Sequence, residues 1–311
     1  MVEVPGHRAR QALRQLAAMP EEKPFNPPKD QPGQPGIVDA HQHVWTLTAH
    51  DQPWLRQPGN EPLLRDYTEA DLRPLATAAG VTATVVVQTI AEAPETPDLL
   101  ELAAASDLIA AVVGWVDLQS DQVADTIAAL QDRSDGRFLR GIRHPVLIEP
   151  DENWLRRPAV HRGLAAVGVA GLCYDIVVPP VVLPAAIDAV AACQDTTFVL
   201  DHLGNPADTA NPGEDWTSAI RRLAEFPNTF CKLSGVLAEA VALSELRPCY
   251  EVALAAFGPD RLMFGSDWPP CTLTATYESV VTTARALIAE LSPAEQAAIL
   301  GGTARLAYRL P

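Results

Sequence analysis

Short apolar runs alternate with longer amphipathic segments along the chain from residue 37 onward. The runs are rich in Val, Ile, Leu and Phe, which is typical of strands buried on both faces of a sheet. We predict strands at Ile37–His43, Ala83–Thr89, Ile109–Asp117, Phe138–His144, Gly171–Val177, Thr197–His202, Thr229–Ser234 and Leu262–Asp267. The segments between and after them predict helices at Thr68–Ala79, Pro97–Ala105, Val123–Ser134, Val160–Val167, Leu183–Gln194, Asp215–Glu225, Ser244–Phe257 and Tyr277–Leu291.

Strands that alternate with helices indicate a parallel sheet covered by helices on both faces. Eight repeats over about 275 residues suit a (β/α)₈ barrel, also called a TIM barrel, whose usual length is about 250 residues. A doubly wound open sheet is the alternative. The dinucleotide-binding version of that sheet is disfavoured because no Gly-X-Gly-X-X-Gly motif follows an early strand. We therefore predict one barrel domain over residues 37–311.

Residues 1–36 are predicted to be an extension that precedes the barrel. Arg8–Met19 has the apolar spacing of a short helix, and the stretch from Pro20 to Gly36 contains six prolines. Proline fixes φ and removes a backbone donor, so this stretch is incompatible with a regular helix or a central strand. We expect an extended, proline-rich arm.

Composition narrows the classes of partner. The net charge of −16 argues against binding to nucleic acid or to an anionic membrane surface. The apolar runs are all shorter than the ~20 residues of a membrane span, and the polar start of the chain lacks a secretory signal. The five cysteines form no Cys-X-X-Cys pair and are expected to be reduced thiols. We expect a cytoplasmic protein that acts on a small molecule, with homo-oligomerisation left open.

The first predicted strand ends in His41-Gln42-His43. Alternate residues of a strand face one side, so both imidazoles should leave this strand in one direction. Functional sites of (β/α)₈ barrels lie at the carboxyl ends of the strands. The pair could bind Zn²⁺ or donate hydrogen bonds to a carbonyl oxygen. A chance pair of surface histidines is the alternative.

Two other strand ends carry residues suited to the same chemistry. Asp267 could hold a metal and take a proton from water, or it could cap the following helix. His202 is the natural third histidine, unless it only makes hydrogen bonds in the core. Asp201, just before it, is expected to face away and brace the loop.

Further polar and aromatic residues near the strand ends could hold a substrate. Arg143 could bind a carboxylate or polyol in bidentate fashion, or form a structural ion pair. His144 and Asp175 could contact substrate hydroxyls, with a supporting role as the alternative for Asp175. Trp45 and Trp268 could pack against a sugar-like ring or plug the barrel mouth, as could Trp54.

Lys232 lies within the seventh predicted strand, in Phe-Cys-Lys-Leu-Ser-Gly. It either faces the helix layer or pairs with a buried acid, and we do not expect it to act as a nucleophile.

Five segments in order resemble the amidohydrolase superfamily, specifically its lactonase-like branch of fuconolactonase, rhamnonolactonase, sulfomuconolactonase and 2-pyrone-4,6-dicarboxylate lactonase. They are Ile37-Val38-Asp39-Ala40-His41-Gln42-His43-Val44-Trp45, Gly141-Ile142-Arg143-His144, Val199-Leu200-Asp201-His202-Leu203-Gly204-Asn205-Pro206, Cys231-Lys232-Leu233-Ser234-Gly235 and Arg261-Leu262-Met263-Phe264-Gly265-Ser266-Asp267-Trp268-Pro269. The resemblance implies a (β/α)₈ barrel and hydrolysis of a sugar-acid lactone or a cyclic dicarboxylic ester.

The resemblance also implies roles for residues. It puts His41, His43 and His202 around a carbonyl oxygen or a metal and makes Asp267 the base that activates water. The implied metal is one divalent ion, Zn²⁺ first, held by His41, His43 and Asp267, although some members of this branch look metal-independent. The chain departs from the wider superfamily because its fourth strand ends without a lysine. Its fifth strand ends in Tyr174-Asp175 where many relatives have histidine, which disfavours a binuclear centre.

Three functions are compatible with this reading. The first is a lactone hydrolase of carbohydrate metabolism, in which Asp267 deprotonates water and later returns the proton to the ring oxygen. The second is a metal-dependent decarboxylase or hydratase of an unsaturated or aromatic acid on the same barrel. The third is a non-enzymatic barrel that serves as a binding or scaffold protein.

Overall fold

The computed structural model describes residues 36–239 and 242–311. The chain divides into two units, and the described residues belong to the second, residues 35–311. The helix predicted at Arg8–Met19 lies outside the described residues, as does the proline-rich stretch apart from Gly36. The fold below is therefore that of the second unit.

Within the described residues, eight parallel strands follow one another in sheet order. They are β1 (Ile37–Gln42), β2 (Val81–Val87), β3 (Ile109–Gly114), β4 (Leu139–Pro145), β5 (Cys173–Val177), β6 (Thr197–Leu200), β7 (Thr229–Leu233) and β8 (Leu262–Phe264). The barrel nearly closes where Asp267 N–H donates to His41 O at 2.8 Å and His43 N–H donates to Trp268 O at 2.7 Å. The predicted (β/α)₈ barrel is confirmed, and the open sheet was wrong.

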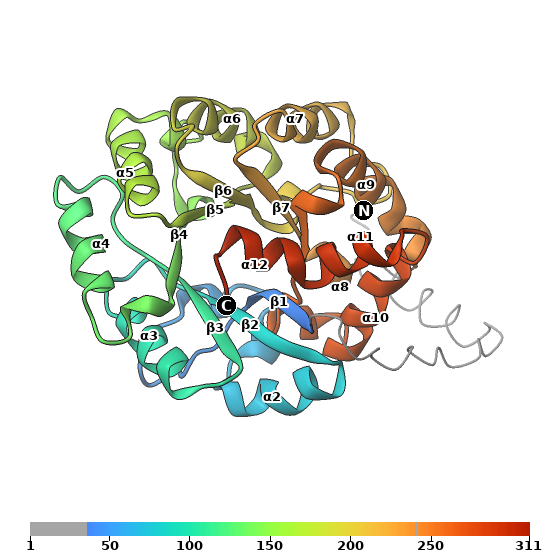
Figure 1. The fold of residues 1–311 in the computed structure, drawn as a ribbon, viewed down its shortest axis with the longest axis horizontal. Coiled ribbons are helices and arrows are strands. Elements are labelled where there is room, and N and C mark those ends of the chain that lie inside the picture. Colours follow the sequence, from blue (N-terminus) through green and yellow to red (C-terminus); the bar gives the residue numbers. More distant parts are fainter. Residues whose placement is uncertain (1–35, 240–241) are drawn as a thin grey trace, which may run out of the picture. The chain divides into compact units, whose positions relative to one another are not determined.

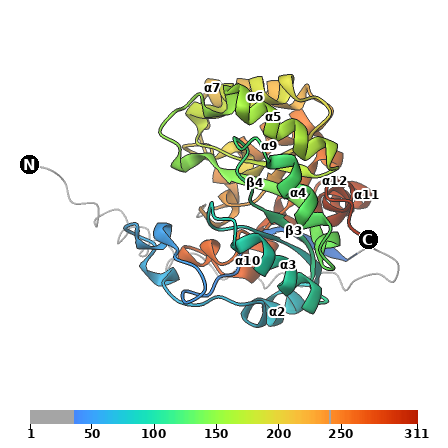
Figure 2. The same cartoon turned by 90° about the vertical axis from the view of Figure 1, so that its left-hand side faces the viewer.

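Helices surround the ring of strands (Figures 1 and 2). They are α2 (Glu69–Ala78), α3 (Glu95–Ala105), α4 (Val123–Gln131), α5 (Pro158–Val169), α6 (Leu183–Ala192), α7 (Glu214–Ala224), α8 (Val236–Glu239), α9 (Leu243–Phe257), α10 (Tyr277–Leu287), α11 (Pro293–Ala297) and α12 (Thr303–Ala307). The last predicted helix, Tyr277–Leu291, ends early at Leu287. A new helix starts at Pro293 because Ser292 and Glu295 form a reciprocal capping box.

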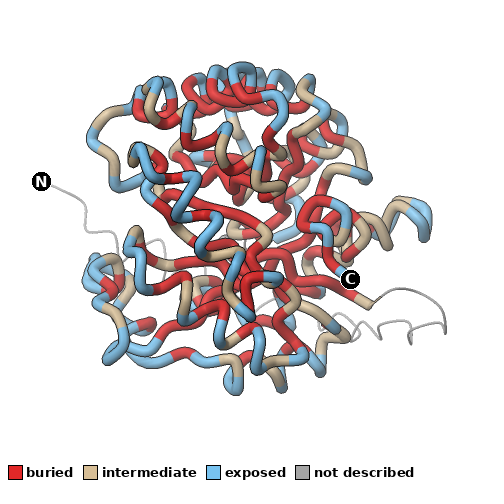
Figure 3. The backbone as a smooth tube through the Cα atoms, turned by 60° about the vertical axis from the view of Figure 1, so that its left-hand side comes forward, coloured by how far each residue is buried: buried red, intermediate tan, exposed pale blue. Residues whose placement is uncertain are grey.

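The core has two layers, and in Figure 3 the buried segments, drawn in red, gather in the interior of the fold. The larger layer packs the outer faces of the strands against the helices. The smaller layer fills the inside of the barrel with residues such as Val38, Val113 and Met263. Tyr308 and Leu310, near the end of the chain, belong to this inner layer. Figure 1 shows α12 in front of the ring of strands, and the thiol of Cys173, the first residue of β5, donates to Ala307 O at 2.9 Å. The C-terminal segment therefore plugs the end of the barrel at which the strands begin.

All five cysteines lie in the described part of the chain, where they are buried thiols outside any disulfide. Among the described residues, no helix is both long enough and apolar enough to cross a membrane.

Candidate active site

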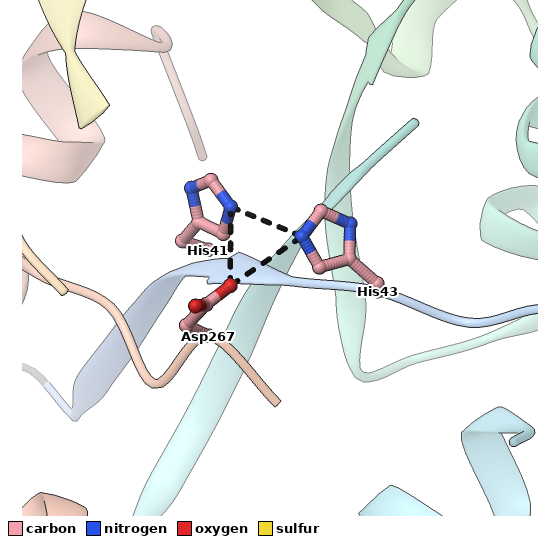
Figure 4. Close-up of side chains that lie close together, drawn as sticks. All are labelled: His41, His43 and Asp267. Atoms are coloured by element: carbon pink, nitrogen blue, oxygen red, sulfur yellow. Dashed lines mark hydrogen bonds and ion pairs between the residues drawn. The ribbon is translucent and has the colours of Figure 1, made fainter. Parts of the chain in front are cut away.

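Side chains from the first and last strands of the sheet meet at the carboxyl end of the barrel. His41 is the penultimate residue of β1, His43 lies just beyond that strand, and Asp267 lies three residues after β8. The Nε2 atoms of His41 and His43 are 3.1 Å apart. Asp267 Oδ1 lies 3.6 Å from His41 Nε2 and 3.5 Å from His43 Nε2. Figure 4 shows the three side chains pointing at a common point.

This donor set fits a single divalent ion. Ligand atoms about 2.0–2.1 Å from a tetrahedral Zn²⁺ are separated from one another by about 3.3 Å. The three separations at this site bracket that value, and imidazole nitrogen with carboxylate oxygen is a usual ligand combination for zinc. His41, His43 and Asp267, the metal ligands expected from the sequence, form one group of described residues that could hold an ion, and His41, Asp201 and His202 form another.

The orientation of His43 is set by the backbone of β2. Its Nδ1 lies 2.7 Å from the carbonyl oxygen of Val87. A carbonyl only accepts, so Nδ1 carries the hydrogen and Nε2 presents a lone pair to the site.

His202 and Asp267 are held by an unusual backbone. Their φ angles are 55° and 57°, in the left-handed region that non-glycine residues rarely occupy. The space around the histidine rings also demands glycine nearby. A Cβ on Gly235 would lie 2.8 Å from His202 Nδ1, and one on Gly265 would lie 2.7 Å from His41 Cβ. Backbone strain of this kind is often found at functional sites.

Burial and neighbouring charges shift the pKa values of Asp267, His202 and His41. Burial by itself raises the pKa of Asp267, but interactions with the three histidines outweigh burial and hold that pKa below its ordinary value. Burial lowers the pKa of His202. Burial and the nearby Lys232 ammonium lower the pKa of His41. The site therefore contains an ionised Asp267 carboxylate beside two imidazoles, those of His41 and His202, whose pKa values lie below the ordinary value for histidine.

Arg143 reaches into the site from β4, where both of its Nη groups have partners and its buried Nε has none among the described residues. Nη1 donates to Asp201 Oδ2 at 3.2 Å, and Nη2 donates to the carbonyl oxygen and to Oε1 of Gln88, the latter at 3.2 Å. Gln88 Nε2 in turn donates to Arg143 O at 3.1 Å. Of the two interpretations made from the sequence, the geometry favours the structural ion pair.

Lys232 pairs with two buried acids inside the barrel, which was one of the two alternatives stated for it from the sequence. Its fully buried Nζ is 2.6 Å from Asp175 Oδ2 and 2.9 Å from Asp201 Oδ1. Asp201 was expected to face away, and this was wrong because it points into the barrel toward Lys232 and Arg143. A signal existed in the alternation of strand residues, since Phe230 and Lys232 share one face of β7.

Four residues assigned to substrate binding lie elsewhere. Asp175 is completely buried against Lys232, so it does not line the cavity for substrate hydroxyls. Its position fits the alternative stated from the sequence, in which it supports other residues of the site. His144 faces outward because its neighbour on β4, Arg143, points inward. Its ring accepts a hydrogen bond from Trp115 Nε1 at 3.0 Å and stacks on Trp154. Trp45 and Trp268 are buried and both pack edge-on against Tyr67, so they plug the barrel mouth.

A cavity of about 760 Å³ opens above the site. It is bordered by polar residues from the strand ends and by an apolar wall from the loops: His43, Pro53, Trp54, Gln57, Thr89, Ile90, Ala91, Glu92, Arg143, Pro145, Leu147, Ile148, Val177, His202, Asn205 and Pro270. Trp54 is the one of the three tryptophans singled out in the sequence that lines it. The volume suits a small organic substrate.

Comparison with known proteins gives a consistent result. A family model described as Amidohydrolase matches residues 38–310. An L-fucono-1,5-lactonase from Burkholderia multivorans is 41% identical over 290 residues, which cover 88% of this chain and 96% of the relative. An L-fucono-1,5-lactonase from Burkholderia ambifaria is 34% identical over 280 residues, which cover 88% of this chain and 95% of the relative.

A solved structure carries the same fold. The crystal structure of an amidohydrolase from Burkholderia multivorans with bound zinc matches with a TM-score of 0.81 and 38% identity, covering 88% of this chain and 99% of that chain. The barrel, the His-X-His pair at β1, the aspartate after β8 and these matches agree, and the chain therefore belongs to the amidohydrolase family.

Proposed function

We propose that this protein is a lactonase that hydrolyses a sugar-acid lactone. The observation that carries the proposal is the convergence of the Asp267 carboxylate with His41 and His43 beside a cavity of about 760 Å³ that His202 also lines. Hydrolysis of a cyclic ester needs a base for water and donors for the carbonyl oxygen, and these residues supply both. The two relatives named L-fucono-1,5-lactonase support the same reaction class.

In the proposed mechanism, Asp267 accepts a proton from a water molecule as the water oxygen bonds to the lactone carbonyl carbon. Its lowered pKa keeps it ionised and ready to accept. The tetrahedral intermediate then collapses, and the bond between the carbonyl carbon and the ring oxygen breaks. The protonated Asp267 returns the proton to the ring oxygen, which becomes the hydroxyl of an open-chain hydroxy acid.

The histidines stabilise the charge that develops on the carbonyl oxygen. Ser234 Oγ lies 2.9 Å from His202 Nδ1 and can donate to it, which leaves His202 Nε2–H as a donor toward substrate. His41 Nε2 lies on the same side, 3.1 Å from His43 Nε2. When bound, a divalent ion held by His41, His43 and Asp267 would supply Lewis-acid polarisation of the carbonyl.

We further propose that the substrate is an uncharged lactone with an apolar substituent. Among the described residues that line the cavity, Arg143 is the cation; its Nη groups donate to Asp201 and Gln88, and its Nε is buried. A substrate carboxylate would instead meet the acidic Glu92 on the same wall. Leu147 and Ile148 offer an exposed aliphatic surface beside these polar groups. Hydrolysis of a neutral aldonolactone therefore fits better than that of a cyclic dicarboxylic ester.

Asp267→Asn tests the proposal. The amide cannot accept the proton from water, so kcat for an aldonolactone should fall by roughly three orders of magnitude, followed by acid release with a pH indicator. Asn tolerates the left-handed backbone, so the circular dichroism spectrum should not change. The matched control is Asp125→Asn, on the exposed face of α4, which should retain wild-type turnover. Near-wild-type turnover by Asp267→Asn would remove Asp267 from the mechanism.

A further inference from the structure

Trp54 lines the cavity, yet the proposed mechanism gives it no part. It lies in the short 3₁₀ turn Pro53–Arg56, in the loop between β1 and α2. The residue is partly exposed, and its indole meets the buried ring of Trp45 edge-on, with the two ring centres 5.2 Å apart. Among the described residues that line the cavity, Trp54 has the largest flat apolar surface.

The indole N–H of Trp54 is already engaged by a neighbour in the same loop. Its Nε1 donates to Gln52 Oε1 at 2.8 Å. Because an indole nitrogen only donates, the oxygen of the Gln52 amide must face Trp54, and the amide nitrogen must point the other way. Trp54 therefore offers the cavity its ring carbons rather than a hydrogen-bond donor.

The amide of Gln52 continues into the wall of the cavity. Its Nε2 donates to Thr89 Oγ1 at 2.8 Å, and the Thr89 hydroxyl donates to Glu95 Oε1. Glu95 also accepts from the backbone N–H of Thr89 at 2.9 Å and from that of Ile90 at 3.2 Å. Donors and acceptors alternate without conflict from Trp54 to Glu95, so this chain of hydrogen bonds has one direction.

The chain of hydrogen bonds is sheltered from water, since Gln52 and Glu95 are each 3% exposed. A buried amide keeps its partners because losing one would leave a polar group unsatisfied. On the main chain, Asn60 Nδ2 donates to Trp54 O at 3.0 Å, so the backbone and the side chain of Trp54 are both held. The indole is thus fixed before a substrate arrives, and binding costs little side-chain entropy.

A fixed aromatic surface suits one part of a lactone. A sugar-acid lactone has C–H groups on its ring faces and hydroxyls around its edge, and an indole ring packs well against C–H groups. The apolar turn Val146–Ile148 borders the cavity from β4, three strands along the ring from β1, whose loop carries Trp54. The turn and the indole therefore meet different parts of one ligand.

We propose that Trp54 is a specificity-determining residue that packs against the ring face of the lactone, and that Gln52 is a positioning residue that fixes the indole through Thr89 and Glu95. The inference rests on the proposed lactone hydrolysis for the identity of the ligand. The hydrogen bonds themselves belong to the free protein, so the role of Gln52 and the role of Trp54 have separate tests.

The first test reads the indole N–H signals of nitrogen-15-labelled protein without ligand. The signal of Trp54 is the one that vanishes in Trp54→Phe. In Gln52→Leu it should move upfield because its N–H loses the acceptor, while the signals of tryptophans that do not contact Trp54 stay in place. If Gln52→Leu does not fold, Thr89→Val removes only the next hydroxyl in the chain and should move the same signal in the same direction. An unmoved Trp54 signal would overturn the role of Gln52.

The second test measures binding without turnover, by calorimetric titration of the Asp267→Asn parent with a neutral γ-aldonolactone. Adding Trp54→Leu should raise Kd about tenfold, whereas Trp54→Phe, which keeps a flat ring, should stay within about threefold of the parent. Adding Gln52→Leu should raise Kd by an intermediate factor, although Gln52 does not line the cavity.

Two contrary outcomes of this titration are distinguishable. Equal Kd values for the parent and for Trp54→Leu would overturn the role of Trp54 and leave the proposed function standing. A γ-aldonolactone that does not bind even to the parent would refute the proposed function, and with it the ligand assigned to Trp54.

Discussion

His202 and Asp267, the two side chains proposed to contact the reacting ester, both have a left-handed backbone. Such a conformation costs about 1–3 kcal/mol for a non-glycine residue. The cost is tolerated because surrounding contacts fix both residues, including the hydrogen bond from Asp267 N–H to the β1 backbone. At the scale of single residues, the strained backbone lowers stability at the two positions where the chemistry is proposed.

Glu95 gives a prediction about pH. It accepts hydrogen bonds from Thr89 N–H and Ile90 N–H, which belong to the loop that lines the cavity. Burial nevertheless raises the pKa of Glu95 above its ordinary value of 4.5. A carboxyl whose pKa is raised by folding binds its proton more tightly in the folded state, so its contribution to stability is present at low pH and lost as the pH rises.

Relative to Glu95→Gln, the wild type should therefore lose free energy of unfolding as the pH increases from about 4.5 toward 8. Urea unfolding of both proteins at several pH values measures this difference. The exposed Glu278→Gln serves as the control, and its difference from the wild type should stay flat. A difference that grows in the opposite direction would refute the assigned sign.

Single residues were predicted unevenly from the sequence. The strand-end rule found His41, His43, His202 and Asp267 because polar residues that end apolar runs are easy to see. The partners of Lys232 could not be read, since they come from strands far apart in the chain and meet only when the barrel curls. His144 was assigned to the site although the alternation of β4 sends it outward once Arg143 points inward.

At the scale of elements, the eight strands and the principal helices were predictable because burial on both faces leaves a strong apolar signature. The strand ends were placed too late in most cases. β8 ends at Phe264, three residues before Asp267, because the chain leaves the ladder to aim its functional side chains. The C-terminal segments α11 and α12 were missed because each has only five residues, too few for a periodic pattern.

The short 3₁₀ turn Val146–Ile148 after β4 is the apolar wall of the cavity. Leu147 and Ile148 are 56% and 63% exposed, so changing them should hardly affect folding. The double variant Leu147→Ser/Ile148→Ser should raise KM about tenfold for a lactone with an apolar substituent, since covering such side chains contributes roughly 1–2 kcal/mol.

For a lactone without that substituent, KM should change little. The measurement is therefore KM of the double variant for both lactones. Val169→Ser, 91% exposed at the end of α5, is the matched surface control. Equal effects on both substrates would show that the turn does not contact the substituent.

At the scale of the whole molecule, the inner core depends on the plug at the end of the chain. Tyr308 is 1% exposed and packs with residues from several strands inside the barrel. Tyr308→Ala should lower the free energy of unfolding by about 3–5 kcal/mol, the usual cost of deleting a buried aromatic ring. For a domain of this size that corresponds to a decrease in Tm of roughly 10 °C.

Differential scanning calorimetry measures the change in Tm. Leu306→Ala, two residues earlier on α12 but 66% exposed, should leave Tm nearly unchanged. Equal Tm values for Tyr308→Ala and Leu306→Ala would mean that the plug does not contribute to the stability of the core.

The plug also imposes an order on biosynthesis. The site joins His41, from the first strand, to Asp267, after the last one, and its lysine is steadied through Asp175 by Tyr308. A ribosome synthesises these residues in sequence, so His41 meets its partners only after the C-terminal residues have been made. A nascent chain can therefore form its strands before the hydrogen bond from Tyr308 to Asp175 exists, and a message broken shortly before the Tyr308 codon would yield a protein without that contact.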